Sequence, residues 1–143
     1  MGSVNFAGIT LSPLDIIETD GGAVMHALKA TDPSYVAFGE AYFSRVRPGA
    51  VRAWKRHTRM TMNVVVPVGH IRFVFAASDT GPFLSHDLGP DVGYARLTVA
   101  PGVWFGFQGR SQGDSMLLNL ASIVHDRSEA ETRGLDHFQY DWN

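Results

Sequence analysis

Short stretches rich in β-branched and aromatic residues, separated by glycine and proline, follow one another along this chain. They span residues 41–46, 63–66, 71–75, 94–99, 103–107 and 115–122. Ile71, Phe73 and Phe75 fall on one face of their stretch, and this period of two is typical of a strand with one face in a core. Residues 115–122 are apolar on both faces, which predicts a central strand.

The connections between these stretches predict how they are joined. The segment from Pro67 to His70 separates 63–66 from 71–75, so these two strands are predicted to form a tight hairpin. Helix is scarce, and only residues 15–19 and 126–132 are predicted to form a turn or two. Several short strands spaced by turns indicate an all-β sandwich, jelly roll or small barrel. Closing such a sheet removes its edges, and the mouth of a barrel can hold one small ligand.

Composition narrows the class of protein. A length of 143 residues predicts a single domain over 1–143. The net charge of −2 gives no electrostatic reason to expect a nucleic acid or an anionic membrane as partner. The absence of cysteine excludes disulfides, thiolate metal sites and a cysteine nucleophile. No basic segment followed by an apolar run opens the chain, and no apolar run reaches ~20 residues, so we expect a cytoplasmic protein.

The densest polar segment is 52–59. On a regular strand its two faces would carry Arg52, Trp54 and Arg56 on one side, and Ala53, Lys55 and His57 on the other. A lysine and a histidine aimed into a barrel could bind an anionic ligand and move a proton, since both residue types titrate readily when their surroundings change. The alternative is a solvated basic edge strand, on which lysine discourages pairing between sheets.

Other chemistry finds less support. None of the six histidines forms a pair with the spacing of metal ligands, so no metal and no other cofactor is expected. Signatures for dinucleotide, phosphate-loop and serine-elbow sites are missing. The aromatic group of Trp104, Phe105 and Phe107 would either stack on a base or sugar or fill the core.

Four segments together resemble a known family. They are residues 39–54, 64–71 and 100–107, and a closing segment at 119–126 with 134–136 and 140–142. In their order and spacing they resemble the 3,5-epimerases of dTDP-4-keto-6-deoxy sugars (the dTDP-4-dehydrorhamnose 3,5-epimerase-like family), over residues 39–142. The resemblance implies a jelly-roll or cupin barrel, a double-stranded β-helix with short terminal helices, that acts without metal. It also implies a homodimer in which N-terminal strands are exchanged.

The resemblance carries over to individual residues unevenly. Arg52 matches the family arginine that contacts the nucleotide diphosphate, a role that suits a planar guanidinium. The family's catalytic histidine falls on Lys55, with His57 two residues on, and the aspartate that orients it is matched by Asp136. The remaining substrate-binding residues are expected to be Arg56, Asn63, Trp104 and Phe107. The family's lysine falls near Met62, and its two tyrosines fall on Leu118 and near Ile123, so these groups are lost.

These matches favour an epimerase or isomerase of a nucleotide-linked 4-keto-6-deoxy sugar, serving polysaccharide or glycoside biosynthesis. Epimerisation beside a ketone needs a base for the C–H proton, a donor for the enolate and an acid for the opposite face. Lys55 and His57 would replace the family's pair. The loss of the tyrosines keeps a second interpretation open, a non-catalytic cupin that binds a sugar nucleotide or a partner enzyme. A third interpretation is a metal-dependent cupin enzyme, and the missing ligand set argues against it.

Overall fold

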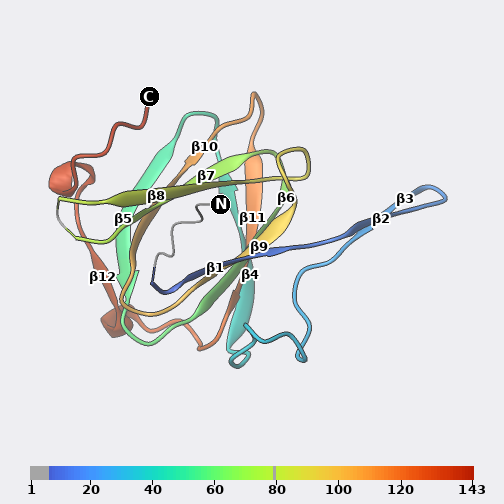
Figure 1. The fold of residues 1–143 in the computed structure, drawn as a ribbon, viewed down its shortest axis with the longest axis horizontal. Helices are drawn as coiled ribbons and strands as arrows, with labels where there is room; N and C mark the ends of the chain where they lie inside the picture. The colour runs from blue at the N-terminus through green and yellow to red at the C-terminus, as the bar shows by residue number, and fades with distance from the viewer. Residues whose placement is uncertain (1–6, 79) are drawn as a thin grey trace.

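Two five-stranded antiparallel sheets face each other in the computed structural model, which describes residues 7–78 and 80–143 (Figure 1). The first sheet has the order β1 (Ile9–Pro13), β9 (Ala95–Val99), β6 (Met62–Val68), β11 (Ser115–Ala121) and β4 (Glu40–Val46). The second has the order β12 (Ala130–Thr132), β5 (Val51–His57), β10 (Trp104–Gly109), β7 (Ile71–Ala76) and β8 (Phe83–Leu88). This arrangement confirms the predicted all-β jelly roll. Residues 1–6, where no basic segment followed by an apolar run was found, lie outside the described residues.

Strand β7 shows why the two sheets pack. Ile71, Phe73 and Phe75 point into the core between the sheets, as their alternation predicts. Val74 points the other way and joins a second cluster, with Trp54, on the outer side of the second sheet. Each fully buried side chain of this size stabilises the fold by about 1.5–3 kcal/mol, so β7 is held from both faces.

The predicted hairpin between residues 63–66 and 71–75 is wrong. Strand β6 belongs to the first sheet and β7 to the second, so the connection crosses from one sheet to the other. Gly69 makes this crossing at φ 85°, and a Cβ there would lie 2.3 Å from Ser115 Oγ. Ser115 Oγ accepts the His70 N–H at 3.0 Å, which fastens the crossing to β11. Strand β11 lies between β6 and β4, which confirms the prediction of a central strand.

The helix predicted over residues 15–19 is also wrong. Strands β2 (Ile16–Thr19) and β3 (Gly22–Met25) form a hairpin that projects from the barrel (Figure 1). The two β-branched residues that open β2 favour a strand, and Asp20 and Gly21 form the two-residue turn that such a hairpin needs. Within residues 7–78 and 80–143, helix is confined to two 3-10 turns near the C-terminus, η1 (Arg127–Glu129) and η2 (Leu135–His137). Of the helix predicted over 126–132, only residues 127–129 are helical, as η1, and residues 130–132 form strand β12 instead.

The C-terminal segment covers the outer side of the second sheet. The Phe138 and Trp142 rings lie 4.9 and 5.5 Å from the Trp54 ring. Trp54 Nε1 donates to the Leu135 carbonyl at 3.2 Å. These contacts hold the middle of β5 from behind, and so fix the side chains that β5 turns toward the inside of the barrel. No helix within the described ranges has the length and apolarity to cross a bilayer.

Candidate active site

A bulge in β5 decides which side chains face the barrel interior. Lys55 lies opposite Phe105 of β10, and Ala53 lies opposite Gly106, so Trp54 between them has no partner on β10. A bulge of this kind leaves one residue unpaired and changes the direction of its neighbours. A Cβ on Gly106 would lie 2.5 Å from the Ala53 Cβ, so only glycine lets the strands approach this closely.

The bulge corrects the predicted faces of β5. On a regular strand Arg52 would share a face with Trp54 and turn away from Lys55. In the structure Arg52 lines the same cavity as Lys55 and His57, and Trp54 is packed in the outer aromatic cluster. Strand β5 also lies between β12 and β10, so it is not an exposed edge.

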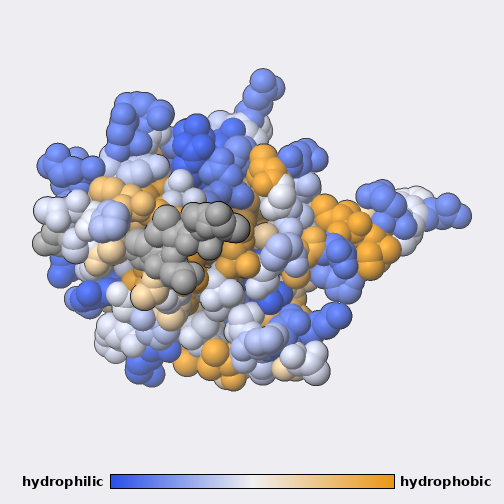
Figure 2. All heavy atoms as spheres, viewed as in Figure 1, coloured by the Kyte–Doolittle hydropathy of each residue, from blue (hydrophilic) through white to orange (hydrophobic). Residues whose placement is uncertain are grey.

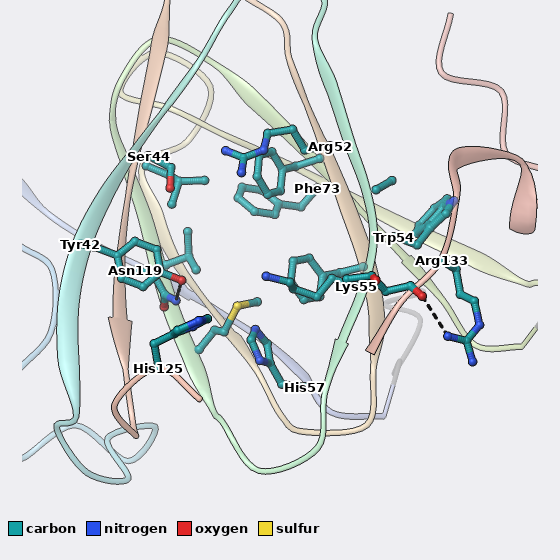
Figure 3. Close-up of a pocket in the computed structure, with 17 residues that line it drawn as sticks. Tyr42, Ser44, Arg52, Trp54, Lys55, His57, Phe73, Asn119, His125 and Arg133 are labelled. Atoms are coloured by element: carbon teal, nitrogen blue, oxygen red, sulfur yellow. Dashed lines mark hydrogen bonds between the residues drawn. The ribbon is translucent and has the colours of Figure 1, made fainter. Parts of the chain in front are cut away.

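The cavity lies between the two sheets and has a volume of about 420 Å³. Figure 3 shows its two walls, with β5 carrying the cationic side chains on one side and β4 and β11 carrying polar side chains on the other. Its polar lining includes Tyr42, Ser44, Arg52, Lys55, His57, Asn119, His125 and Arg133. Its apolar lining includes Met62, Val64, Phe73, Phe105, Phe107 and Leu117. A cavity of this size, with polar and charged side chains beside aromatic and aliphatic ones, suits a small polar organic ligand.

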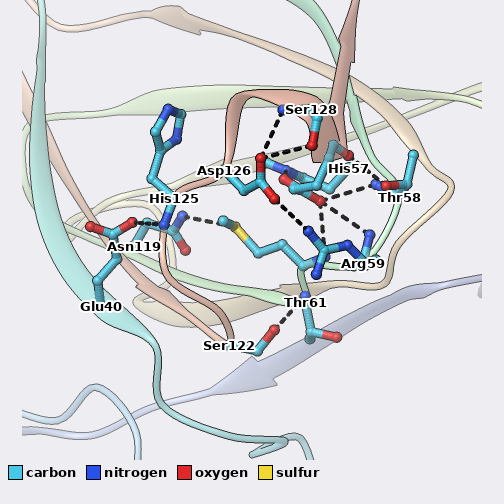
Figure 4. Close-up of polar contacts among 12 residues, drawn as sticks. Glu40, His57, Thr58, Arg59, Thr61, Asn119, Ser122, His125, Asp126 and Ser128 are labelled. Atoms are coloured by element: carbon cyan, nitrogen blue, oxygen red, sulfur yellow. Dashed lines mark hydrogen bonds and ion pairs between the residues drawn. The ribbon is translucent and has the colours of Figure 1, made fainter.

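A buried carboxylate orients His57. Glu129 Oε1 contacts His57 Nδ1, and both side chains are almost fully buried. Glu129 Oε2 accepts the backbone N–H groups of Thr58, Arg59 and Met60 at 3.2, 3.1 and 3.2 Å. Figure 4 shows His57, Thr58 and Arg59 drawn together at the end of β5. Four donors on one carboxylate offset the cost of burying its charge.

Protonation of the pair follows from these contacts. Burial lowers the pKa of His57 below 6.5; Glu129 opposes this shift, and Lys55 and His125 add to it by charge repulsion. Burial works to raise the pKa of Glu129, but the bonds from His57 and the backbone N–H groups outweigh it and lower that pKa below 4.5. At neutral pH we therefore take Glu129 as ionised and His57 as neutral. Its Nδ1–H is then donated to the carboxylate, and the lone pair of Nε2 is free to accept a proton.

Two cations, Lys55 and Arg52, line the same cavity as this histidine. Among the described residues, neither Lys55 nor Arg52 forms a side-chain ion pair or hydrogen bond, and the Arg52 guanidinium lies over the Phe107 ring at 5.6 Å. The cavity wall therefore combines a neutral base with unneutralised positive charge. Such a wall can bind an anionic ligand and stabilise negative charge that develops on it.

The structure brings together four of the eight residues that the sequence assigns to the site: Arg52, Lys55, His57 and Phe107 line the cavity. The other four do not reach it. Arg56 faces outward, where it donates to Glu131 Oε1 at 2.6 Å and lies 4.8 Å from the Trp104 ring. Trp104 itself packs against Phe138 at 5.7 Å.

Asn63 and Asp136 also lie outside the cavity. Asn63 Nδ2 donates to the Ser34 carbonyl at 3.1 Å, and Asn63 Oδ1 accepts from Thr98 Oγ1 at 2.6 Å, so this amide holds a neighbouring segment in place. Asp136 is exposed in η2. The carboxylate that contacts His57 is Glu129, which the sequence analysis did not single out.

Sequence reasoning missed further cavity residues as well, among them Tyr42, Asn119 and His125. Tyr42 and Ser44 both line the cavity, and both belong to the stretch predicted as a strand over 41–46. Their separation by two residues was the available signal that the two side chains share one face of that strand. Asn119 and Leu117 are the β11 side chains that line the cavity, whereas Leu118, the position matched to the family's tyrosine, does not. His125 follows β11, and its backbone N–H is held by Glu40 Oε1 at 2.6 Å. Nothing in the local sequence marks Glu129 as the partner of a histidine 72 residues away.

Metal ligands do not gather in the part of the chain that the structure describes. No group of three or more His, Cys, Asp or Glu side chains there has the proximity needed to hold a metal ion.

Solved structures of sugar-nucleotide enzymes match this chain, whereas no protein-family model and no curated protein sequence does. A dTDP sugar isomerase from Desulfovibrio desulfuricans G20 is 36% identical, with a TM-score of 0.89 over 95% of this chain and 91% of that one. QdtA, a sugar 3,4-ketoisomerase from Thermoanaerobacterium thermosaccharolyticum crystallised with TDP, is 18% identical, with a TM-score of 0.76 over 92% of each chain. The dTDP-4-dehydrorhamnose 3,5-epimerase from Sulfolobus tokodaii is 19% identical, with a TM-score of 0.79 over 96% of this chain and 84% of that one. The two more distant matches support the fold alone.

Proposed function

This chain belongs to the dTDP-sugar isomerase and epimerase family, and we propose that it isomerises or epimerises a nucleotide-linked 4-keto-6-deoxy sugar. The observation that carries the proposal is the buried Glu129 that holds His57 with Nε2 free in the cavity. The reaction begins with removal of a proton from a carbon next to the ketone. A neutral histidine oriented by a carboxylate is suited to that step.

His57 takes the proton from the carbon, and the C–H electron pair forms a carbon–carbon double bond with the former carbonyl carbon. The carbonyl π pair moves onto the ketone oxygen, which becomes an enolate. Lys55, a cation beside His57 with no counter-ion among the described residues, stabilises that negative charge. Glu129 stabilises the imidazolium that forms at His57, in the way a buried carboxylate supports a general base.

Arg52 is proposed to bind the diphosphate. Its guanidinium lines the cavity, lies against Phe107 and has no counter-ion in the described part of the chain. A planar guanidinium can donate two parallel hydrogen bonds to phosphate oxygens. Binding the diphosphate here would leave the sugar within the cavity, toward Lys55 and His57.

The direct test is uptake of solvent deuterium. The protein is incubated in D₂O with dTDP-4-keto-6-deoxyglucose, and the sugar is examined by NMR. Deuterium at a carbon next to the ketone is expected. No uptake, with the protein still stabilised against heat by the nucleotide sugar, would refute the proposed reaction and favour the alternative, a cupin that only binds a sugar nucleotide.

Variants then test the two residues. We expect His57→Gln to slow uptake by about 10²–10⁴-fold and Lys55→Met by about 10²-fold, because each removes a group that acts in the transition state. His86→Gln on β8 and Lys29→Met before β4 are matched controls away from the cavity. Activity that survives both cavity changes would show that the catalytic residues lie elsewhere.

We also propose that the protein acts as a homodimer. The β2–β3 hairpin projects from the barrel, and hydrophobic surface gathers where the projection leaves the body of the molecule (Figure 2). On this hairpin Ile17 and Val24 are 46% and 51% exposed. Strand β4 forms an edge of the first sheet and exposes Phe43. An exposed edge and an exposed apolar hairpin are features that a second copy of this chain would cover.

Light scattering after gel filtration tests the dimer. We expect a mass of twice 15.7 kDa for the wild type and a shift toward 15.7 kDa for Phe43→Glu. A wild-type protein that elutes as a monomer at micromolar concentration would refute this proposal without bearing on the reaction.

A further inference from the structure

The wall opposite His57 carries a pair of polar side chains to which the mechanism above gives no role. Asn119 of β11 and Tyr42 of β4 are register partners on neighbouring strands, and both line the cavity (Figure 3). Asn119 Nδ2 donates to the Tyr42 hydroxyl oxygen at 3.0 Å. Because that oxygen accepts from the amide, the phenolic hydrogen is left to be donated, and no acceptor for it occurs within the described ranges.

Asn119 adds a second unused group. Asn119 is 2% exposed, and its Oδ1 has no hydrogen-bond partner among the described residues. The amide nitrogen is occupied, by Tyr42 and by a longer contact of 3.9 Å to Met60 Sδ. A buried acceptor without a partner is uncommon in proteins, and at a cavity wall it indicates a donor that arrives with the ligand.

The pair therefore offers one donor and one acceptor side by side. A ketone oxygen needs a donor, and a hydroxyl on the adjacent carbon can give its hydrogen to an acceptor. We propose that Tyr42 and Asn119 recognise the α-hydroxyketone part of the sugar, with Tyr42 on the ketone oxygen and Asn119 Oδ1 on the neighbouring hydroxyl. This rests on the proposed function and adds a catalytic residue and a specificity-determining residue to it.

Tyr42 also completes the proton balance of the reaction. When His57 removes the carbon proton, the ketone oxygen gains an electron pair, and the Tyr42 hydroxyl gives it a proton. An epimer forms when a solvent water on the other face gives a proton to the same carbon and Tyr42 recovers its own from the oxygen. The His57 imidazolium then releases its proton to the hydroxide that this water has become. Return of the proton from His57 to the former carbonyl carbon, while the Tyr42 phenolate takes the proton of the adjacent hydroxyl, moves the ketone by one carbon. Both routes end with the two residues as they began.

Tyr42→Phe tests the donor, since it removes only the hydroxyl. We expect turnover of dTDP-4-keto-6-deoxyglucose to fall by about 10²-fold, with affinity for thymidine diphosphate unchanged within twofold. Tyr140→Phe, the same change in the aromatic cluster on the outer side of the second sheet, is the matched control and is expected to match the wild type. A Tyr42→Phe variant that turns over within threefold of the wild type would overturn the role of Tyr42.

Asn119→Leu tests the acceptor by binding alone. Calorimetry compares the keto sugar nucleotide with an analogue that lacks the hydroxyl next to the ketone. The wild type is expected to prefer the hydroxylated compound about tenfold, and the variant to bind the two equally. A preference of the same size in both proteins would overturn the role of Asn119. Because this readout needs no turnover, it decides the recognition site even if the wild type takes up no deuterium, the result that refutes the proposed reaction.

Discussion

Replacement of Glu129 by glutamine probes the centre of the site most sharply. Glu129 Oε2 accepts three backbone N–H groups, while Oε1 contacts His57 Nδ1. Glutamine has only one oxygen to offer. The three N–H groups require that oxygen, so in Glu129→Gln the side-chain NH₂ must face His57.

That orientation reverses the tautomer of His57. An amide N–H facing Nδ1 needs a lone pair there, so the ring proton moves to Nε2. The nitrogen left for the substrate then has no lone pair and cannot accept the carbon proton. A catalytic histidine held in the wrong tautomer loses about 10²–10⁴-fold in rate, and we expect turnover to fall in this range.

The effect on stability is smaller. A hydrogen bond to a charged acceptor contributes about 1.5–3 kcal/mol and one to a neutral acceptor about 0.5–1.5 kcal/mol. Weakening the three backbone bonds of Glu129 therefore costs about 3–4.5 kcal/mol, offset in part because an amide is cheaper to bury than a carboxylate. We expect the free energy of unfolding of Glu129→Gln to fall by about 1–3 kcal/mol, so the variant stays folded for assay.

The assay combines deuterium uptake with ¹⁵N NMR of the His57 ring, which distinguishes the two tautomers. Glu131→Gln is the matched control, since Glu131 lies two residues along and pairs with Arg56 outside the cavity. We expect it to turn over within twofold of the wild type. A Glu129→Gln variant with wild-type turnover, or with the proton still on Nδ1, would refute the role assigned to the carboxylate.

Three further outcomes are expected. Burial lowers the pKa of His57, and the base is its neutral form, so kcat/KM should rise with pH through an inflection below 6.5; an inflection above 6.5 would contradict this. The same shift means that the free energy of unfolding should fall as pH drops below 6.5, because the unfolded chain then binds more protons. The lowered pKa of Glu129 should make it fall further below pH 4.5. Arg52→Gln should weaken thymidine diphosphate binding about tenfold and make the measured affinity depend less on salt concentration. Arg45→Gln is the surface control and should bind like the wild type. An Arg52→Gln variant with the same affinity as the wild type would contradict the role of Arg52. Gly39→Ala would place a Cβ 2.0 Å from the Ile123 backbone, and we expect it to lower the free energy of unfolding, measured in denaturant, by about 2–4 kcal/mol. Gly134 has open space around it, so Gly134→Ala should lower that free energy by less than about 0.5 kcal/mol. Equal losses in the two variants would count against the close approach at Gly39.

Local pattern was sufficient for the parts of the molecule that depend on near neighbours. The alternation of Ile71, Phe73 and Phe75 places them in the core, and the two apolar faces of 115–122 place that strand inside a sheet, because the period of side chains along a strand needs no knowledge of its partner. Four motifs in order were enough to indicate the family. The same local reasoning failed for the connection at Gly69, because tight turns and crossings between sheets use similar residues.

Beyond the four cavity residues that the sequence assigned, tertiary structure decided the composition of the site. The bulge that turns Arg52 toward Lys55 and His57 depends on the fit of Ala53 against Gly106 of another strand and on the docking of Trp54 beneath a segment 81 residues away. Glu129 reaches His57 across 72 residues, and Tyr42 meets Asn119 across 77. The sequence by itself determined six of the strands, β4, β6, β7, β9, β10 and β11, and which residues are able to move a proton. Which of those residues meet in one cavity is set by cross-strand packing, and no periodicity along the chain records that.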